Sequence, residues 1–272
     1  MCPTPPPAAP RPPSSGGDAP SRDDRAGRGL FIVLEGIDGS GTTTQAQLLT
    51  EHLAGRGHRA YATNEPSSGP VGMLIRLALS GRLLGPTLRY HDADEDRDDA
   101  GDTTLDARTL ALLFAADRMD HLVTQVEPNL ARGRHVVCDR YLLSSLAYQG
   151  LSLPEEWVLE INRHARVPDL TFYLDVPVEH ARMRMRAARW TRDLYEDDWH
   201  QRRIRERYQE VVARGLPGVG PVVVVDASRP RAEVTDEITR ALDERLAARA
   251  ADPDPQLTLL EPGAAGGPRV ER

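Results

Sequence analysis

The sequence predicts an α/β protein whose core is a five-stranded parallel sheet with helices on both faces. Short runs of apolar or β-branched residues, each long enough for one buried strand, alternate with segments of helical spacing. The first run ends in a glycine-rich loop that leads into a helix, as in phosphate-binding βα units. Strands that alternate with helices in this way pair in parallel and are covered on both faces.

The individual strands and helices are predicted from these runs. The strands are expected at 31–34, 59–63, 135–138, 170–174 and 222–225. The helices are expected at 45–53, 73–84, 105–127, from about 179, at 201–214 and at 234–250. Pro128 should end or kink the third helix, because proline cannot donate the backbone hydrogen bond of a helix interior.

The composition is that of a folded protein without a membrane span. Hydrophobic residues make up 40% of the 272 residues, charged residues make up 28%, and the net charge is −7. This charge argues against binding to nucleic acid through a basic surface. No apolar run approaches the ~20 residues that cross a bilayer, and the first residues lack the apolar stretch of a secretory signal. Cys2 and Cys138 cannot form a disulfide framework, so a cytoplasmic location is expected.

One folded domain is expected at 29–250, between two segments of low hydrophobicity. Residues 1–28 are rich in proline, alanine, serine and glycine and should be disordered, and 251–272 should form a flexible tail. Within the domain, 91–102 is an acidic run. A metal site is one interpretation of this run, but we favour a solvated insertion, because runs of like charge repel one another.

The segment 36–43 has the spacing of a phosphate-binding loop, G-x-x-x-x-G followed by x-[ST]. Gly36, Gly39 and Gly41 allow backbone N–H groups to turn inward around an anion. The helix that follows would point its positive N-terminal end at the same anion. The loop departs from the usual pattern at Thr42, where a lysine normally stands.

The missing lysine has a calculable consequence. A unit charge about 4 Å from a phosphate oxygen contributes ~4 kcal/mol at an effective dielectric constant of ~20. An uncompensated loss would therefore slow phosphoryl transfer roughly a thousandfold. The chain contains no lysine at all. Either other cations replace the lysine, or the protein binds nucleotide without turning it over well.

Two further groups of residues are candidates for ligand contacts. Asp139 and Arg140 follow the third predicted strand, at the sheet edge where ligands bind in parallel sheets. Phe114 and Arg118 lie four residues apart and so share one face of the long helix. Without other context, we would interpret Phe114 as a core phenylalanine and Arg118 as a surface arginine.

An arginine-dense segment follows the fourth predicted strand. Arg182, Arg186 and Arg189 share one helical face, and Arg192 lies just beyond. A solvated face that pairs with acidic side chains would also show this pattern. We favour a functional role, because the phosphate loop elsewhere in the chain lacks its cation.

Together these residues resemble the thymidylate kinase family of P-loop nucleoside monophosphate kinases. The resemblance runs from about residue 30 to 248 and leaves out both tails and the acidic insertion. It is carried by five motifs in order, at 31–45, 65–66, 113–118, 139–149 and 168–177. It implies the P-loop kinase fold with a mobile arginine-bearing lid at about 182–198.

The resemblance also implies residue roles at the donor side. The loop would hold the phosphates of ATP, and Asp38 would face the acceptor phosphate or the metal's water shell. Thr43 and Asp139 would hold Mg²⁺. The implied ATP-binding residues are Gly36, Ile37, Asp38, Gly39, Ser40, Gly41, Thr42, Thr43 and Thr44.

At the acceptor side the resemblance implies a site for dTMP. Phe114 would stack on thymine, Arg118 would donate to a base carbonyl, and Ser145 would occupy the base-polar position. Tyr148 would pack where a ribose 2′-hydroxyl would lie. The implied substrate-binding residues are Glu65, Phe114, Arg118, Arg140, Ser144, Ser145, Tyr148 and Gln149.

The implied reaction transfers the γ-phosphate of ATP to dTMP, with Asp38, Arg140, Arg189 and Arg192 as catalytic residues and a homodimer as the assembly. Asn64 stands where the family commonly has arginine, which puts one acceptor-phosphate contact in doubt. Because Thr42 replaces lysine, we hypothesise that Arg189 or Arg192 supplies the missing charge.

Two alternatives remain open. A deoxynucleoside kinase would need a carboxylate base, for which Glu35 and Glu65 are the candidates. A catalytically weak nucleotide-binding module is suggested by Thr42.

Overall fold

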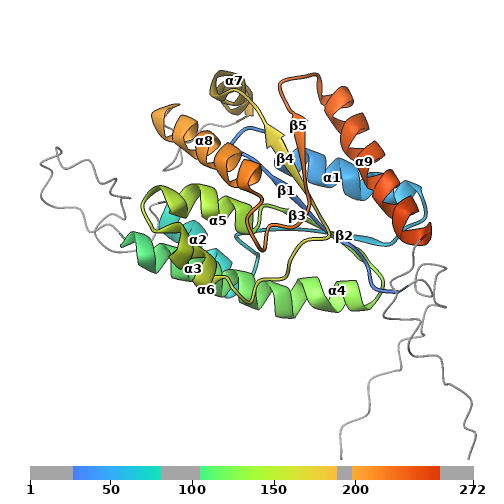
Figure 1. Ribbon diagram of the computed structural model, residues 1–272, viewed down its shortest axis with the longest axis horizontal. Coiled ribbons are helices and arrows are strands. Elements are labelled where there is room, and N and C mark those ends of the chain that lie inside the picture. Colours follow the sequence, from blue (N-terminus) through green and yellow to red (C-terminus); the bar gives the residue numbers. More distant parts are fainter. Residues whose placement is uncertain (1–26, 81–104, 189–197, 252–272) are drawn as a thin grey trace, which may run out of the picture.

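The computed structural model describes residues 27–80, 105–188 and 198–251. Within them, five strands form one parallel sheet in the order β2-β3-β1-β4-β5 (Figure 1). This confirms the predicted fold class. The strands are β1 (Phe31–Glu35), β2 (Ala60–Asn64), β3 (His135–Asp139), β4 (Leu170–Asp175) and β5 (Val222–Asp226).

The central strands are buried because helices cover both faces of the sheet. Every residue of β1 and β3 is buried, which explains why these strands are continuous apolar runs in the sequence instead of alternating ones. In the register, Leu34 of β1 lies between Asp139 of β3 and Phe172 of β4. The loop that follows β1 therefore begins at the middle of the carboxyl edge of the sheet, where ligands bind in such folds.

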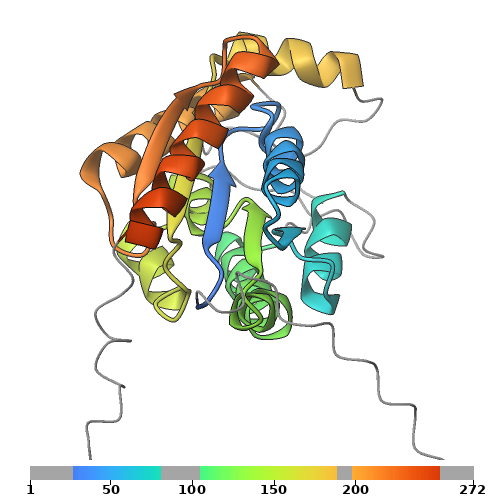
Figure 2. The same cartoon turned by 90° about the vertical axis from the view of Figure 1, so that its right-hand side faces the viewer.

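The helices divide between the two faces of the sheet. α1 and α9 pack against one another on one face, whereas α5 packs against α8 on the other (Figures 1 and 2). α2 packs on α3. The helices are α1 (Thr42–Gly55), α2 (Pro70–Leu79), α3 (Ala107–His121), α4 (Glu127–Ala131), α5 (Leu142–Tyr148), α6 (Glu155–Ile161), α7 (Val178–Ala188), α8 (Asp198–Arg214) and α9 (Arg231–Ala251), with a 3₁₀ turn at Gln149–Leu151.

The long helix before β3 continues past Pro128, near which we expected it to end or kink. A π-helical turn, η2 (Leu122–Val126), separates α3 from α4, which runs on to Ala131. Pro128 is the second residue of α4 and brings no N–H to the helix. The irregularity in the helix therefore lies directly before the proline.

Several sequence-based expectations concern residues outside those described. They are the first 26 residues of the N-terminal segment, the acidic insertion at 91–102, the lid arginines Arg189 and Arg192, and the tail after 251. Among the helices of the described ranges, none combines the length and the apolar character that crossing a bilayer requires.

Candidate active site

The phosphate loop joins β1 to α1 and is shaped by two glycines. Gly39 has φ +79°, and a Cβ there would lie 2.5 Å from the carbonyl oxygen of Ala181. Gly41 caps α1 with φ +102°, in the left-handed region that favours glycine. No side chain of the described residues caps α1, so the N–H groups of its first turn remain available to an anion in the loop.

A hydroxyl and a carboxylate meet beside this loop. The Thr43 hydroxyl donates to Oδ2 of Asp139 at 2.5 Å. The other oxygen of Asp139, Oδ1, is buried and has no hydrogen-bond partner in the part of the chain that the structure describes. Mg²⁺ prefers such oxygen ligands and is usually bound by one or two protein groups together with nucleotide phosphates and water. The two residues thus fit the magnesium site expected from the sequence.

Thr42 is 5% exposed and brings no positive charge to the loop. The loop opens on a cavity of about 910 Å³, to which α7 and the residues after β5 also contribute. Arg140 and Arg184 are two of the cations that line this cavity.

Arg184 contacts the phosphate loop, although the sequence analysis did not single it out. Its Nη1 donates to the carbonyl oxygen of Ser40 at 3.2 Å, and its Nη2 donates to that of Ala227 at 2.7 Å. It lies on a different face of α7 from Arg182 and Arg186, which we had grouped by helical spacing. Arg182 instead pairs with Asp198 at 2.5 Å. Helical spacing alone identifies residues that share a face, but it does not say which face turns toward the loop.

A second, smaller cavity of about 190 Å³ adjoins the loop cavity. It is lined by all eight residues expected to bind the acceptor: Glu65, Phe114, Arg118, Arg140, Ser144, Ser145, Tyr148 and Gln149. Asp38 and Arg140 line both cavities, so the two meet at this pair.

Arg140 is held at this junction by specific contacts. Its Nη2 pairs with Oδ1 of Asp38 at 2.6 Å, and its Nη1 donates to the Tyr148 hydroxyl at 3.0 Å. The backbone of Arg140 has φ +70°. Among the non-glycine residues of the described ranges, Arg140 alone has a positive φ. Backbone strain of this kind concentrates at functional sites. Gln201 of α8, which sequence reasoning also missed, donates to Oδ2 of Asp38 at 3.3 Å.

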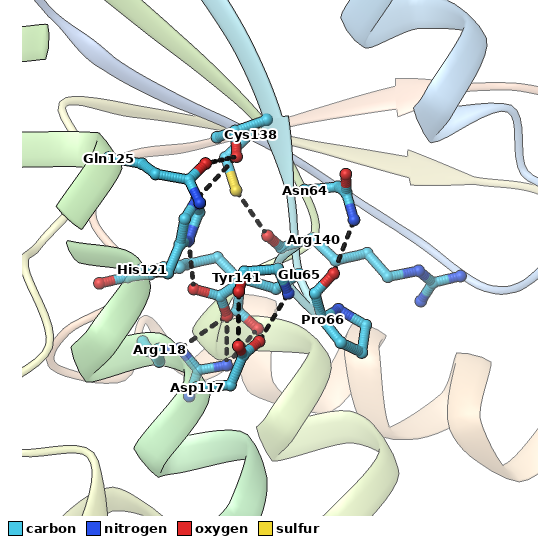
Figure 3. Close-up of polar contacts among 12 residues, drawn as sticks. Asn64, Glu65, Pro66, Asp117, Arg118, His121, Gln125, Cys138, Arg140 and Tyr141 are labelled. Atoms are coloured by element: carbon cyan, nitrogen blue, oxygen red, sulfur yellow. Dashed lines mark hydrogen bonds and ion pairs between the residues drawn. The ribbon is translucent and has the colours of Figure 1, made fainter. Parts of the chain in front are cut away.

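Arg118 lies inside the protein, and the interpretation of it as a surface arginine is wrong. It is 1% exposed and donates from Nε to Glu65 at 3.0 Å (Figure 3). Its Nη2 donates to Ser145 at 2.9 Å and to the Tyr141 carbonyl at 3.1 Å, and its Nη1 donates to Asn162. A guanidinium has five N–H groups. Among the described residues, one N–H on Nη1 therefore has no partner, and Arg118 lines the acceptor cavity.

The two candidate carboxylate bases are both committed to other contacts. Glu35 is fully buried, lines neither cavity, and accepts from Tyr141 N, the Ser144 hydroxyl and the Tyr208 hydroxyl at 2.9, 2.6 and 3.2 Å. Burial raises the pKa of Glu35, although the Ser144 hydrogen bond opposes the rise. Glu65 lines the acceptor cavity, but its oxygens contact Arg118 and His121.

A parallel α/β sheet with a phosphate loop at its carboxyl edge, and an acceptor cavity that meets it, defines the class of P-loop kinases. Comparison with known proteins narrows the class. The family model described as thymidylate kinase matches residues 34–86 and 99–238. The chain belongs to the thymidylate kinase family, which is a family of enzymes.

Curated relatives from several organisms agree with this assignment. A probable thymidylate kinase of Thermococcus kodakarensis is 42% identical over 186 residues, which are 66% of this chain and 82% of the relative. One of Methanococcus maripaludis is 35% identical over 221 residues, 79% of this chain and 96% of the relative. One of Pyrobaculum calidifontis is 37% identical over 221 residues, 80% of this chain and 98% of the relative.

Proposed function

We propose that this protein transfers the γ-phosphate of ATP to dTMP, giving dTDP, and that Mg²⁺ assists the transfer. The observation that carries the proposal is the meeting of the phosphate-loop cavity and the acceptor cavity at Asp38 and Arg140. Phosphoryl transfer depends on positioning and charge neutralisation more than on covalent chemistry. A junction that holds two phosphoryl groups beside a fixed arginine suits that requirement.

On the donor side, the first turn of α1 and the loop glycines would bind the ATP phosphates. Thr43 and Asp139 would hold Mg²⁺, whose charge would offset the negative charge on the phosphate oxygens. The support for this arrangement is the Thr43–Asp139 contact and the buried, unpartnered oxygen of Asp139.

On the acceptor side, Phe114 would stack on thymine, and the remaining N–H of Arg118 would meet a base carbonyl. Ser145 and Gln149 would contact the base edge, and Tyr148 would exclude a ribose 2′-hydroxyl. Arg140 would bind the 5′-phosphate, which would take over from Asp38 as the counter-ion of the guanidinium. The support is that these side chains line one cavity.

The charge that Thr42 does not supply would come from Arg189 or Arg192, both of which lie outside the described residues. Closure of a lid at about 182–198 would bring these arginines to the phosphates and exclude water. The position of α7 supports this idea. This helix begins at Val178, and six residues further on its Arg184 already contacts the phosphate loop.

The same proposal includes a homodimer. Large apolar side chains are exposed on α2, α3 and η2: Met73, Leu74, Leu112, Met119 and Val123. Because α2 packs on α3 and α3 contacts η2, these exposed apolar side chains on neighbouring elements support an interface there. We also propose a cytoplasmic location, supported by the free buried thiol of Cys138, and no nucleic-acid or membrane partner, supported by the net charge of −7.

The proposal is tested by ADP release from ATP in the presence of dTMP, dUMP, dCMP or thymidine. We expect turnover with dTMP and Mg²⁺ and none with thymidine, because neither Glu35 nor Glu65 is placed to deprotonate a 5′-hydroxyl. Turnover with thymidine but not with dTMP would instead support a deoxynucleoside kinase. Binding of ATP and dTMP without turnover would support the catalytically weak nucleotide-binding module.

A further inference from the structure

α3 turns three polar side chains into the protein interior near its C-terminal end. Asp117, Arg118 and His121 are all buried, and His121 is 0% exposed. Buried charged and polar groups are costly unless they are paired, so their partners identify what this part of the helix does. All three contact the chain segment that leaves β2 (Figure 3).

Asp117 holds the far end of this segment. Its two oxygens accept from the Ser67 N–H and from the Ser67 hydroxyl, each at 2.6 Å. Arg118 and His121 hold the near end of the segment, because they bond to different carboxylate oxygens of Glu65. α3 thereby fixes the position of the segment that forms one wall of the acceptor cavity.

His121 connects Glu65 to the sheet. Its Nδ1 is 3.2 Å from Oε1 of Glu65, and its Nε2 is 2.7 Å from the Thr63 hydroxyl. A carboxylate only accepts hydrogen bonds, so Nδ1 carries a proton and donates it to Glu65. In the neutral imidazole, Nε2 then accepts from Thr63.

The two carboxylate oxygens of Glu65 have separate partners. Oε2 accepts from Nε of Arg118 at 3.0 Å and lies 2.9 Å from Nη2 of the same guanidinium, while Oε1 accepts from His121. The terminal torsion of a glutamate side chain is broad, so one partner alone would leave the carboxylate plane loosely defined. The bond from His121 limits this rotation, so the Glu65 carboxylate, together with Ser145, Tyr141 and Asn162, fixes the Arg118 guanidinium.

The sequence spacing places these groups together. His121 lies three residues after Arg118 and so shares its helix face. Thr63 lies in β2 and Glu65 directly after it, and two residues that are two positions apart in an extended chain point to the same side. The π turn of η2 begins at Leu122, directly after His121, and π turns are frequent at functional sites.

We propose that His121 is a positioning residue for recognition of the acceptor base. Through Glu65 it orients Arg118 so that the one N–H of Nη1 without a partner in the described structure faces the acceptor. The inference rests on the proposed function, because it takes dTMP as the acceptor. It predicts that the His121–Glu65 bond, and not the mere filling of the His121 site, sets the affinity for dTMP.

A matched pair of substitutions separates these two roles. In His121→Asn, the side-chain amide nitrogen replaces Nδ1 and retains the bond to Glu65. In His121→Gln, the amide group reaches the position of Nε2, retaining the contact with Thr63 but not the one with Glu65. Asparagine is the smaller residue and leaves the larger cavity, so a purely structural role would make His121→Asn the more damaging change.

The primary measurement is the dissociation constant of dTMP by calorimetry on the full-length protein, with thermal unfolding as the measure of stability. We expect His121→Gln to weaken dTMP binding about tenfold, equivalent to about 1.4 kcal/mol, and His121→Asn to weaken it less than about threefold. The KM for ATP, and kcat at saturating dTMP, should stay within about twofold of the unchanged protein in both variants.

Equal losses of dTMP affinity in both variants would overturn the proposal, as would a larger loss in His121→Asn. So would a fall in kcat or a rise in the KM for ATP that accompanies the loss of dTMP affinity. The binding measurement needs no turnover. If the protein without substitutions binds dTMP but does not phosphorylate it, only the proposed reaction is refuted. Absence of dTMP binding by the unchanged protein would refute both.

Discussion

Changing Thr42 to lysine tests how the protein manages without an ammonium group in its phosphate loop. Thr42 lines the loop cavity, so a lysine there would extend toward the site of the phosphates. A lysine about 4 Å from a phosphate oxygen would contribute ~4 kcal/mol at an effective dielectric constant of ~20. If nothing else supplied that charge, the substitution would raise kcat roughly a thousandfold.

We expect a much smaller effect, because Arg189 or Arg192 supplies the charge in the proposed mechanism. Thr42→Lys alone should change kcat by less than about tenfold. Replacing both arginines with alanine should lower kcat roughly a thousandfold while leaving ATP binding largely intact. Adding Thr42→Lys to that double variant should then recover at least about a hundredfold. Coupled ADP release at saturating ATP and dTMP measures kcat, and calorimetry measures ATP binding.

Gln47→Lys provides the matched control. Gln47 lies on the exposed side of α1, where it bonds to Glu51 at 3.2 Å, and it lines neither cavity. The substitution Gln47→Lys adds the same charge to the same helix. It should leave kcat unchanged both in the otherwise unsubstituted protein and in the double alanine variant. The reasoning is refuted if the double alanine variant keeps the original kcat, or if Thr42→Lys fails to restore activity to it.

Three further predictions concern the metal and the pH dependence of stability. Asp139→Asn should raise the Mg²⁺ concentration for half-maximal activity at least about tenfold; an unchanged Mg²⁺ titration would exclude Asp139 from the site. Burial raises the pKa of Glu35 above 4.5, so the unfolded state loses this proton first, and the free energy of unfolding should fall as pH rises through that range. Glu35→Gln should remove this part of the pH dependence in denaturant titrations; identical pH profiles for the two proteins would contradict it. Burial works against the charge of Asp175, but hydrogen bonds from Arg205 at 2.7 and 3.0 Å outweigh it and lower the pKa of Asp175 below 3.8. The stability from this pair is present above pH 3.8 and is lost as pH falls through the folded pKa, so Asp175→Asn should be less sensitive to acid than the unchanged protein; equal acid sensitivity would contradict this assignment.

The strands and most helices were predictable because their signals are local. The apolar runs of β1 and β3 are continuous since both faces of these strands are covered, and the structure extends each predicted run by one residue. The α1 helix begins at Thr42, three residues earlier than predicted, because the glycine loop itself supplies its N-cap. The short helices α5 and α6 were not predicted individually, because each has only seven residues and shows too little periodicity.

The site was predictable only in part. The motif positions that we expected to bind the acceptor do line one cavity. Their internal partners could not be predicted, because these come from segments far apart in the chain. Glu65 and His121, for example, are 56 residues apart, and Asp38 and Gln201 are 163 apart.

The sequence by itself determined the strands and the longer helices, the phosphate loop with its missing lysine, and the residues at the strand ends, because periodicity and glycine spacing express local backbone geometry. The tertiary structure alone decided that Arg184 contacts the loop, that Asp38 holds Arg140, and that His121 supports Arg118 through Glu65. Such contacts depend on how each helix is rotated against the sheet. That rotation is set by the packing of the whole core, which no short stretch of sequence encodes.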